Sequence, residues 1–363
     1  MKRYSLADHV RILGAIAAKD IVDALRNRLT LSLLVGGVVM MLSSMVLPML
    51  LELNDVPTVL VYDPERSVLI RGLTAHDAFR LRLVDSQEEL ENEVGGSFHF
   101  VLGLTIPPGF RQAQGSGGSV DIDGYAPHWA DPVLVAERVA FFEAQLSQAS
   151  WQTVRINVSE RPIYPALDEI GQPFMFSFNF VIVILVVGLA VVPYLMIEER
   201  ETHAFDVLLV SPARFFHIIV GKGLVGLFYC LVIAIALFAF NARWIVHWDV
   251  ALVGFLSSAL FAVLAGLLVG LAFEDAATMN MWMGVLLLFL LSPLLLEQAI
   301  HRLPGVLQAI IPWIPTTAMT RLLRMAMVAQ VPATAFWTHV GTLVITALAL
   351  YGVLVWRVCQ LDR

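Results

Sequence analysis

Six long apolar segments set the strongest limit on how this 363-residue chain can fold. Each is long enough to cross a bilayer, which takes roughly 20 apolar residues. None contains Asp, Glu, Lys or Arg except the third, which carries Arg214 and Lys222 near its start. A mean hydropathy of +0.77 also argues against an ordinary soluble domain. We therefore expect an α-helical membrane protein with six transmembrane helices, at about residues 29–51, 174–197, 212–242, 250–273, 276–296 and 335–356.

Basic residues near the ends of these segments predict their orientation, because cytoplasmic loops carry an excess of Lys and Arg. Placing the N-terminus in the cytoplasm puts eleven such residues inside and four outside. Both termini are therefore expected in the cytoplasm, with the chain a multi-pass protein of the inner (cytoplasmic) cell membrane. The four outer residues are Arg243, Arg302, Arg321 and Arg324.

Residues 1–28 form a leader with the pattern of an amphipathic helix. One face carries Asp8, Arg11, Lys19, Asp23 and Arg26, and the other carries Val10, Leu13, Ala17, Ile21 and Leu25. We expect this helix to lie in the cytoplasmic interface of the membrane; a helix packed in the cytosol is the less favoured alternative. The segment at 29–51 is too long for the apolar part of a signal peptide and has no cleavage pattern, so it is expected to be retained.

Residues 53–172 are more polar and are large enough to fold independently. Strands are predicted at 59–62, 98–106, 120–125 and 153–158, and helices at 67–81 and 131–151. Ser86 and Glu89 have the spacing of a capping box, which predicts a short helix starting there. Strands that alternate with helices favour an α/β fold. We expect an extracytoplasmic α/β domain inserted between the first and second transmembrane helices.

The remaining residues, 174–357, are expected to form a five-helix transmembrane region. Residues 297–334 interrupt it with an apolar stretch broken by Pro304, Pro312 and Pro315. This pattern predicts short re-entrant or interfacial helices on the outer side.

No motif in the chain predicts catalysis, a bound cofactor or a metal. Gly221-Lys222 lacks the other positions of a Walker A motif. Asp121 and Asp123 lack the fuller oxygen set that calcium needs. The net charge of −7 gives no indication of nucleic-acid binding. The chain is not expected to be an enzyme by itself.

A few polar residues near or within the apolar segments keep two interpretations. Glu274 and Asp275 form either a tight polar turn or a contact with a partner, and the turn is favoured. Asn179 is read as a helix–helix hydrogen bond rather than a substrate contact. Glu297, Arg243 and His247 lie at segment ends, where solvation explains them.

The segment at 198–211 has the pattern of a helix that docks on another protein. Phe205, Leu208 and Leu209 share one helical face, while Glu199 and Asp206 point elsewhere. Pro212 then disfavours helix at the residue before it, so the segment ends abruptly. A cytoplasmic helix of this kind offers a handle to a soluble partner. The predicted contact residues are Glu198, Glu199, Glu201, Thr202, Phe205, Asp206, Leu208 and Leu209.

The layout and several short motifs together resemble the permease subunit of ABC-2 family (type V) ATP-binding cassette transporters. The matching motifs are Glu198-Glu199-Arg200-Glu201-Thr202, Leu208-Leu209-Val210-Ser211-Pro212, Gly221-Lys222, Val61-Tyr62-Asp63, Ile106-Pro107-Pro108-Gly109-Phe110, and Ile314-Pro315 before Arg321–Arg324. The family usually has Gly-Thr where this chain has His203-Ala204.

The resemblance implies an exporter with two permease chains, identical or paralogous, in contact with membrane lipids. Each chain would dock on a separate ATPase subunit that binds ATP and Mg²⁺. Few ionisable groups in the segments favour a lipid-like or amphipathic substrate. The alternative is a non-transporting scaffold or receptor that binds a partner through the extracytoplasmic domain.

Overall fold

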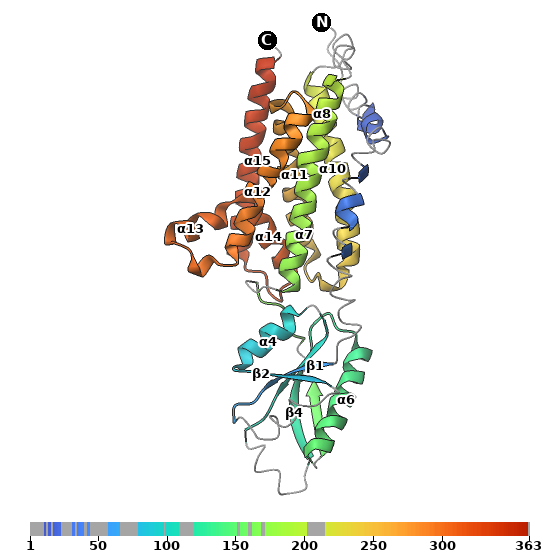
Figure 1. The fold of residues 1–363 in the computed structure, drawn as a ribbon, viewed down its shortest axis with the longest axis vertical. Helices are drawn as coiled ribbons and strands as arrows, with labels where there is room; N and C mark the ends of the chain where they lie inside the picture. The colour runs from blue at the N-terminus through green and yellow to red at the C-terminus, as the bar shows by residue number, and fades with distance from the viewer. Residues whose placement is uncertain are drawn as a thin grey trace. The chain divides into compact units, whose positions relative to one another are not determined.

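The computed structural model describes most of the chain, in two compact units. The described residues are 11, 14–15, 17–22, 31–32, 35–39, 42–43, 57–65, 79–97, 99–108, 119–150, 153–158, 162–167, 171–201 and 215–361. A helical unit comprises Met1–Leu42, Phe176–Ala326 and Val331–Arg363, and a sheet unit comprises Ser43–Met175 and Met327–Gln330 (Figure 1).

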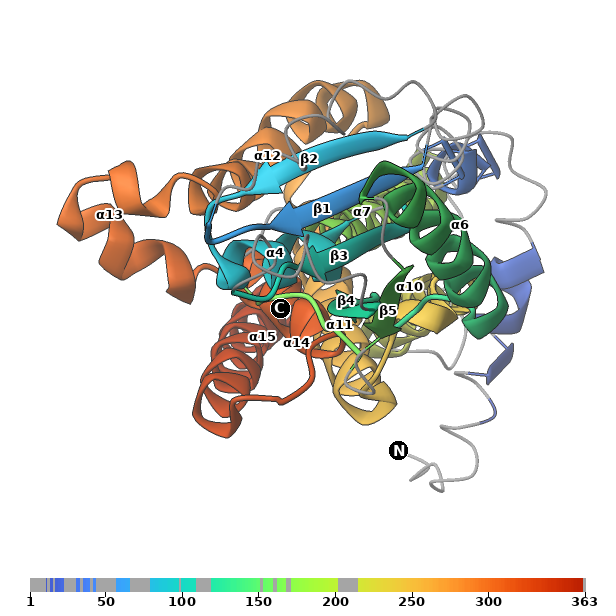
Figure 2. The ribbon, with the colours of Figure 1, turned by 90° about the horizontal axis from the view of Figure 1, so that it is seen from below.

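The sheet unit contains a five-stranded mixed sheet in the order β2-β1-β3-β4-β5, which Figure 2 shows from below. Among the described strands, β3 and β4 pair antiparallel, while β1–β2, β1–β3 and β4–β5 are parallel. The strands are β1 (Thr58–Tyr62), β2 (Arg80–Val84), β3 (Val101–Thr105), β4 (Ser119–Tyr125) and β5 (Thr153–Val158).

Both faces of this sheet pack against a helix in the described part of the unit. Successive side chains of a strand point to opposite faces, so each face has its own core. On one face Val59 and Leu102 share a core with Phe142 of α6 (Pro132–Ser150). On the other face Leu60 packs with Leu90 of α4 (Gln87–Gly96). The central strands are therefore apolar on both faces, as buried parallel strands usually are.

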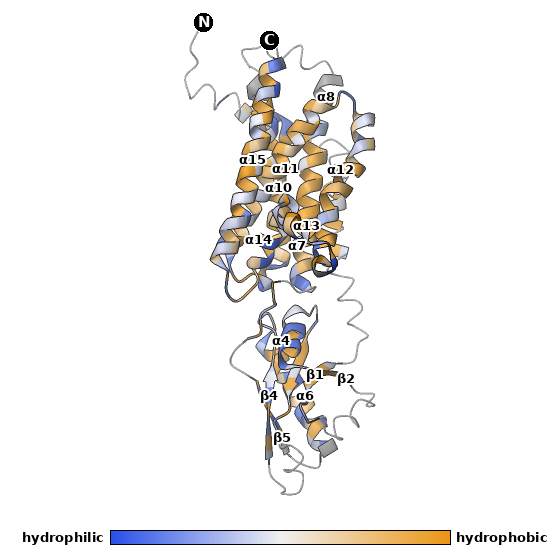
Figure 3. Ribbon diagram, turned by 90° about the vertical axis from the view of Figure 1, so that its left-hand side faces the viewer, coloured by the Kyte–Doolittle hydropathy of each residue, from blue (hydrophilic) through white to orange (hydrophobic). Residues whose placement is uncertain are grey.

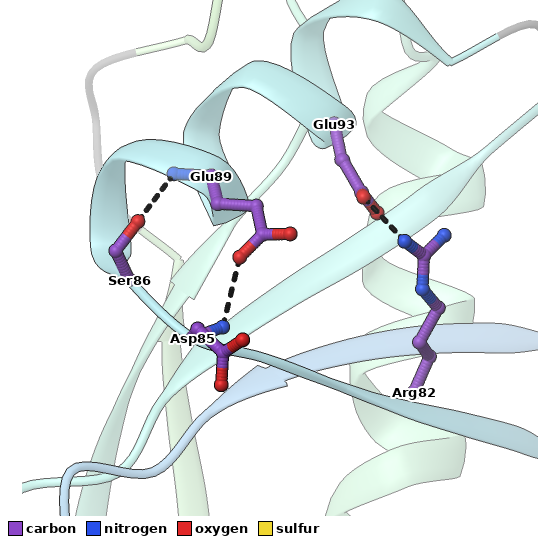
Figure 4. A network of polar contacts seen from close by, with 5 residues as sticks. All are labelled: Arg82, Asp85, Ser86, Glu89 and Glu93. Carbon is purple, nitrogen blue, oxygen red and sulfur yellow. Dashed lines mark hydrogen bonds and ion pairs between the residues drawn. The ribbon is translucent and has the colours of Figure 1, made fainter.

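The start of α4 is stabilised by the predicted capping box (Figure 4). The backbone N–H of Glu89 donates to Ser86 Oγ at 3.0 Å. The Glu89 carboxylate accepts from the backbone N–H of Asp85 at 2.9 Å, one residue earlier than in the usual box. Arg82 of β2 and Glu93 of α4 form an ion pair at 2.6 Å, which ties the helix to the edge strand.

Replacing Ser86 by alanine removes the side-chain acceptor and is expected to destabilise α4 by about 1 kcal/mol. Hydrogen exchange of the α4 amides in the full chain would measure this as a loss of protection. Ser86→Asp keeps an acceptor and should retain most of the protection. Equal protection in wild type and Ser86→Ala would contradict the capping role.

The strands predicted at 59–62, 98–106, 120–125 and 153–158 and the helix at 131–151 are confirmed, with small shifts at their ends. The end of the helix predicted at 67–81 is wrong, because Arg80–Val84 is strand β2. The rest of that helix falls mainly on residues 66–78, which lie outside the described residues.

The helical unit contains five helices that are long and apolar enough to cross a membrane, among the residues that the structure describes. Figure 3 shows their largely hydrophobic composition. They span Gln172–Glu198, His217–Phe240, Trp248–Ala272, Ala276–Glu297 and Ala333–Gln360. These helices confirm five of the six predicted segments as apolar helices of spanning length. The first predicted segment, 29–51, lies mostly outside the described residues.

These five helices carry the labels of Figure 1. The first is built from α7 (Gln172–Val186), the π-helical turn η1 (Val187–Val191) and α8 (Val192–Glu201). The others are α10 (Phe215–Phe240), α11 (Trp248–Ala272), α12 (Ala276–Glu297) and α15 (Ala333–Leu361). A 3₁₀ turn, η2 (Ala242–Trp244), follows α10.

The proline-broken segment before α15 folds into short helices, as predicted. They are η3 (Ile300–Arg302), α13 (Gly305–Ile310), η4 (Ile311–Trp313) and α14 (Pro315–Met325). α13 is exposed and extends sideways from the helical unit (Figure 1), whereas α14 is almost entirely buried. The placement of this segment in the outer interface stays a prediction.

Candidate functional site

The predicted docking segment connects α8 to α10, but most of it lies outside the described residues. α8 ends at Glu201 and α10 begins at Phe215. Glu198 is half-buried in the last turns of α8. The other seven predicted contact residues have no described side chain; they are Glu199, Glu201, Thr202, Phe205, Asp206, Leu208 and Leu209. What the structure describes in detail is the set of helices that lead into and out of this segment.

η1 and α8 pack closely against α11 through small residues. A Cβ on Gly266 would collide with the carbonyl oxygen of Gly188, and one on Gly188 would lie 2.6 Å from the Ala262 Cβ. A Cβ on Gly270 would lie 2.7 Å from Met196 Sδ. Ala262, Gly266 and Gly270 are spaced four residues apart, so they share one face of α11. Small residues at this spacing let membrane helices approach backbone to backbone.

The π-helical turn η1 lies at this same contact. Pro193 has no N–H to donate to the carbonyl of Leu189, so the regular α-helical pattern is interrupted there. A single π turn absorbs such an interruption, and π turns often occur at functional positions. The helix that ends at the docking segment therefore has a local irregularity where Gly188 contacts α11.

The ion pairs among the described residues of the helical unit include two with a buried carboxylate that sequence reasoning missed. Lys222 Nζ lies 2.8 Å from Asp20 Oδ2, with the two side chains only 2% and 3% exposed. Arg321 Nε lies 2.6 Å from Glu297 Oε1, and the Glu297 side chain is 5% exposed. Two features of the sequence could have indicated these pairs. Asp20 lies on the apolar face of the leader, and Lys222 and Glu297 are charged residues within or next to long apolar segments. The prediction that solvation explains Glu297 is wrong, because its side chain is only 5% exposed and is paired with Arg321.

Asp275 caps the start of α12. Its Oδ1 accepts a hydrogen bond from the backbone N–H of Thr278 at 2.8 Å. This bond, with a second from the Thr278 side chain, lowers the pKa of the exposed Asp275 carboxyl. The polar turn favoured from the sequence therefore has a defined structural role at Asp275, since the cap satisfies a free N–H of the first helical turn.

The lowered pKa predicts a pH dependence for the start of α12. Because the folded pKa lies below the ordinary value, the cap stabilises the helix at pH above that value and is lost as pH falls through the lowered pKa. Amide exchange at residues 277–280, corrected for intrinsic rates, should accelerate on acidification. Asp275→Asn keeps an acceptor without titrating, so its exchange should not respond. An equal response in both proteins would contradict the prediction.

Two apolar grooves lie between the helices of this unit. One, of about 480 Å³, lies between α11 and α12 and is lined by side chains that include Leu268, Phe273, Trp282 and Phe289. The other, of about 400 Å³, lies between α10, α11 and α15. Among the described residues, no group of three or more His, Cys, Asp and Glu side chains could hold a metal ion.

Five long apolar helices and the apolar grooves between them define a multi-pass helical membrane protein. The model of a family described as "ABC-2 family transporter protein" matches residues 28–357, and the chain belongs to this family. It is therefore a permease, a membrane transport subunit. No curated protein and no solved structure matches the chain.

Proposed function

We propose that the chain is the permease of an ATP-driven exporter that moves a lipid-like or amphipathic substrate outward. The observation that carries this proposal is the family match over residues 28–357, in a chain whose sequence contains no Walker A motif. Members of this family typically pair with an ATPase subunit. The energy for transport would therefore come from a second polypeptide that binds ATP and Mg²⁺.

The ATPase would dock on residues 198–211 in the cytoplasm. α8 enters this segment and α10 leaves it, so both helices would receive any movement of the docked subunit. The glycine contact at Gly188 and Gly266 would pass that movement to α11, because closely packed backbones cannot slide without shifting one another. In this proposed coupling route, movement of the ATPase would be received at Glu199, Glu201 and Phe205 and would reach α11 inside the membrane.

The arrangement in the membrane follows the orientation expected from the sequence. Six helices would cross the inner membrane with both termini in the cytoplasm, and the sheet unit would be extracytoplasmic. α12 carries an exposed apolar surface that includes Met281, Val285, Leu288 and Phe289. Membrane lipids or a second permease chain, identical or paralogous, would cover it.

The proposed substrate class is supported by the grooves. The described residues that line them are almost all apolar, and none of these residues is charged. Surfaces of this kind suit acyl chains or other amphipathic molecules better than small ions.

Affinity isolation of the tagged chain from its native membrane tests the assignment. The expected result is co-isolation of an ATP-binding cassette ATPase at a fixed ratio to the permease. A chain that is isolated repeatedly without any such ATPase would instead favour a scaffold or receptor and would overturn the proposal.

A further inference from the structure

The leader docks on the membrane helices through one face. Residues 17–22 are helical, with Ala17 and Asp20 buried and Ile21 half-buried, while the intervening positions 18 and 19 are exposed. This i, i+3, i+4 spacing places the buried positions on a single face. Asp20 thus brings a carboxylate into a face that is otherwise apolar.

Two polar contacts hold this face against α10. Lys222 Nζ lies 2.8 Å from Asp20 Oδ2, and the Tyr229 hydroxyl donates to the backbone carbonyl of Ile21 at 2.7 Å. Lys222 and Tyr229 are seven residues apart, so they share one face of α10 and are separated by about 10 Å along its axis. Because the two contacts lie at different points along the axis of α10, together they fix where the leader lies on α10 and how it is oriented relative to that helix.

The ion pair is unusual because both charges are almost fully buried. Removing one partner of such a pair leaves an uncompensated charge in a low-dielectric environment, and this is strongly unfavourable. Ionisable groups buried among membrane helices commonly have a functional role, and here each group has a defined partner.

The stretch of α10 that contacts the leader also packs against the helices of the proposed coupling route. Gly226 follows Lys222 by one helical turn, so the two residues share one face of α10. A Cβ on Gly226 would collide with Val192 Cγ2 of α8 and would lie 3.1 Å from Val263 Cγ2 of α11. Lys222 follows the start of α10 at Phe215 by only two turns. The leader and the α8–α11 contact therefore meet the same stretch of α10, and this helix begins where the docking segment ends.

We propose that the Asp20–Lys222 pair is a positioning joint that makes the leader move together with α10 during ATP-driven coupling. Movement delivered at the start of α10 would reach the leader through this pair and through Tyr229. The source of the movement rests on the proposed function, whereas the docking of the leader does not.

The test combines two measurements on the full chain in lipid nanodiscs. Hydrogen exchange of residues 17–22 reports docking without any ATPase, and ATP hydrolysis by the co-isolated complex reports coupling. The variants are Asp20→Asn, Lys222→Met and the charge swap Asp20→Lys with Lys222→Asp. Arg11→Met is the matched control, because it removes a charge from an exposed helical position of the leader.

The proposal expects each single variant to lose about 100-fold in protection of the leader. ATP hydrolysis should fall about tenfold in complexes that still assemble. A tenfold fall corresponds to 1.36 kcal/mol of lost coupling free energy. The charge swap should regain much of both signals, which a variant that merely fails to fold could not do, and Arg11→Met should change neither.

Unchanged leader protection in the single variants would overturn the proposal. Lost protection with unchanged ATP hydrolysis would overturn it as well, because the docked leader would then have no part in coupling. If the wild-type chain never associates with an ATPase, the proposed function and the coupling role are both overturned. Hydrogen exchange of residues 17–22 needs no ATPase, so it still shows whether the leader is docked.

Discussion

Gly266→Ala is expected to destabilise the helical unit by about 1–3 kcal/mol, the usual cost of inserting a methyl group into a closely packed core. The added Cβ would collide with the carbonyl oxygen of Gly188, which is a backbone atom and cannot rotate away. The π turn and α11 must then move apart, and the contacts along their whole crossing weaken. Thermal unfolding of the purified chain in detergent measures the change.

Gly352→Ala is the matched control for this variant. Gly352 lies in α15, and a Cβ there meets nothing within 4 Å. Its replacement should not destabilise the protein, and the higher helix propensity of alanine should add up to about 1 kcal/mol of stability. If Gly266→Ala were as stable as Gly352→Ala, the close contact between η1 and α11 would be refuted.

Arg321→Met is expected to destabilise the protein by about 3 kcal/mol, the lower end of the range for breaking a buried ion pair. The variant leaves the Glu297 carboxylate without its cation in a position where it is only 5% exposed. The lower end applies because the Arg321 side chain is 22% exposed, so water already screens part of the interaction.

The double variant Glu297→Gln with Arg321→Met separates charge from packing. It removes both charges, so it should recover much of the stability that the single variant loses. Arg302→Met, at an exposed position of η3, controls for loss of an arginine in the same region. Thermal unfolding compares the two variants. If the double variant were no more stable than Arg321→Met, the unpaired Glu297 charge could not explain the stability lost in the single variant.

Local patterns were sufficient to predict most helices and strands. The capping box at Ser86 marked the start of α4, and uninterrupted apolar composition marked the five long helices. β2 was missed although Arg80–Leu83 alternates polar and apolar residues, because the helix predicted at 67–81 extended into this short run. Pairing with β1 makes this segment a strand, and such long-range pairing overrides local propensity.

The buried ion pairs could not be predicted from local patterns, because each joins residues far apart in the sequence. Lys222 and Asp20 are about 200 positions apart, and Glu297 and Arg321 belong to different helices. A charge near a helix end reads as solvated until its tertiary partner is known. The π turn was likewise missed, although Pro193 and Gly188 were visible signs of an irregular helix.

The docking segment differs from these elements because the structure does not test it. Its contact residues were predicted in detail from the sequence and remain a prediction. Its apolar positions Phe205, Leu208 and Leu209 and its acidic positions Glu199 and Glu201 lie where the structure describes no side chains. The family assignment supports the role proposed for this segment, and only a functional measurement can test which residues carry it.

ATP hydrolysis by the complex of the chain with its co-isolated ATPase is that measurement. The variant Glu199→Lys, Glu201→Lys, Phe205→Asp should lose at least about tenfold of the permease-coupled rate, since it reverses two charges and places a carboxylate on the apolar face. Glu88→Lys with Glu91→Lys, which reverses two charges in α4 of the sheet unit, should retain the wild-type rate. An unchanged rate in the docking-segment variant would contradict the account of this chain as a permease driven through residues 198–211.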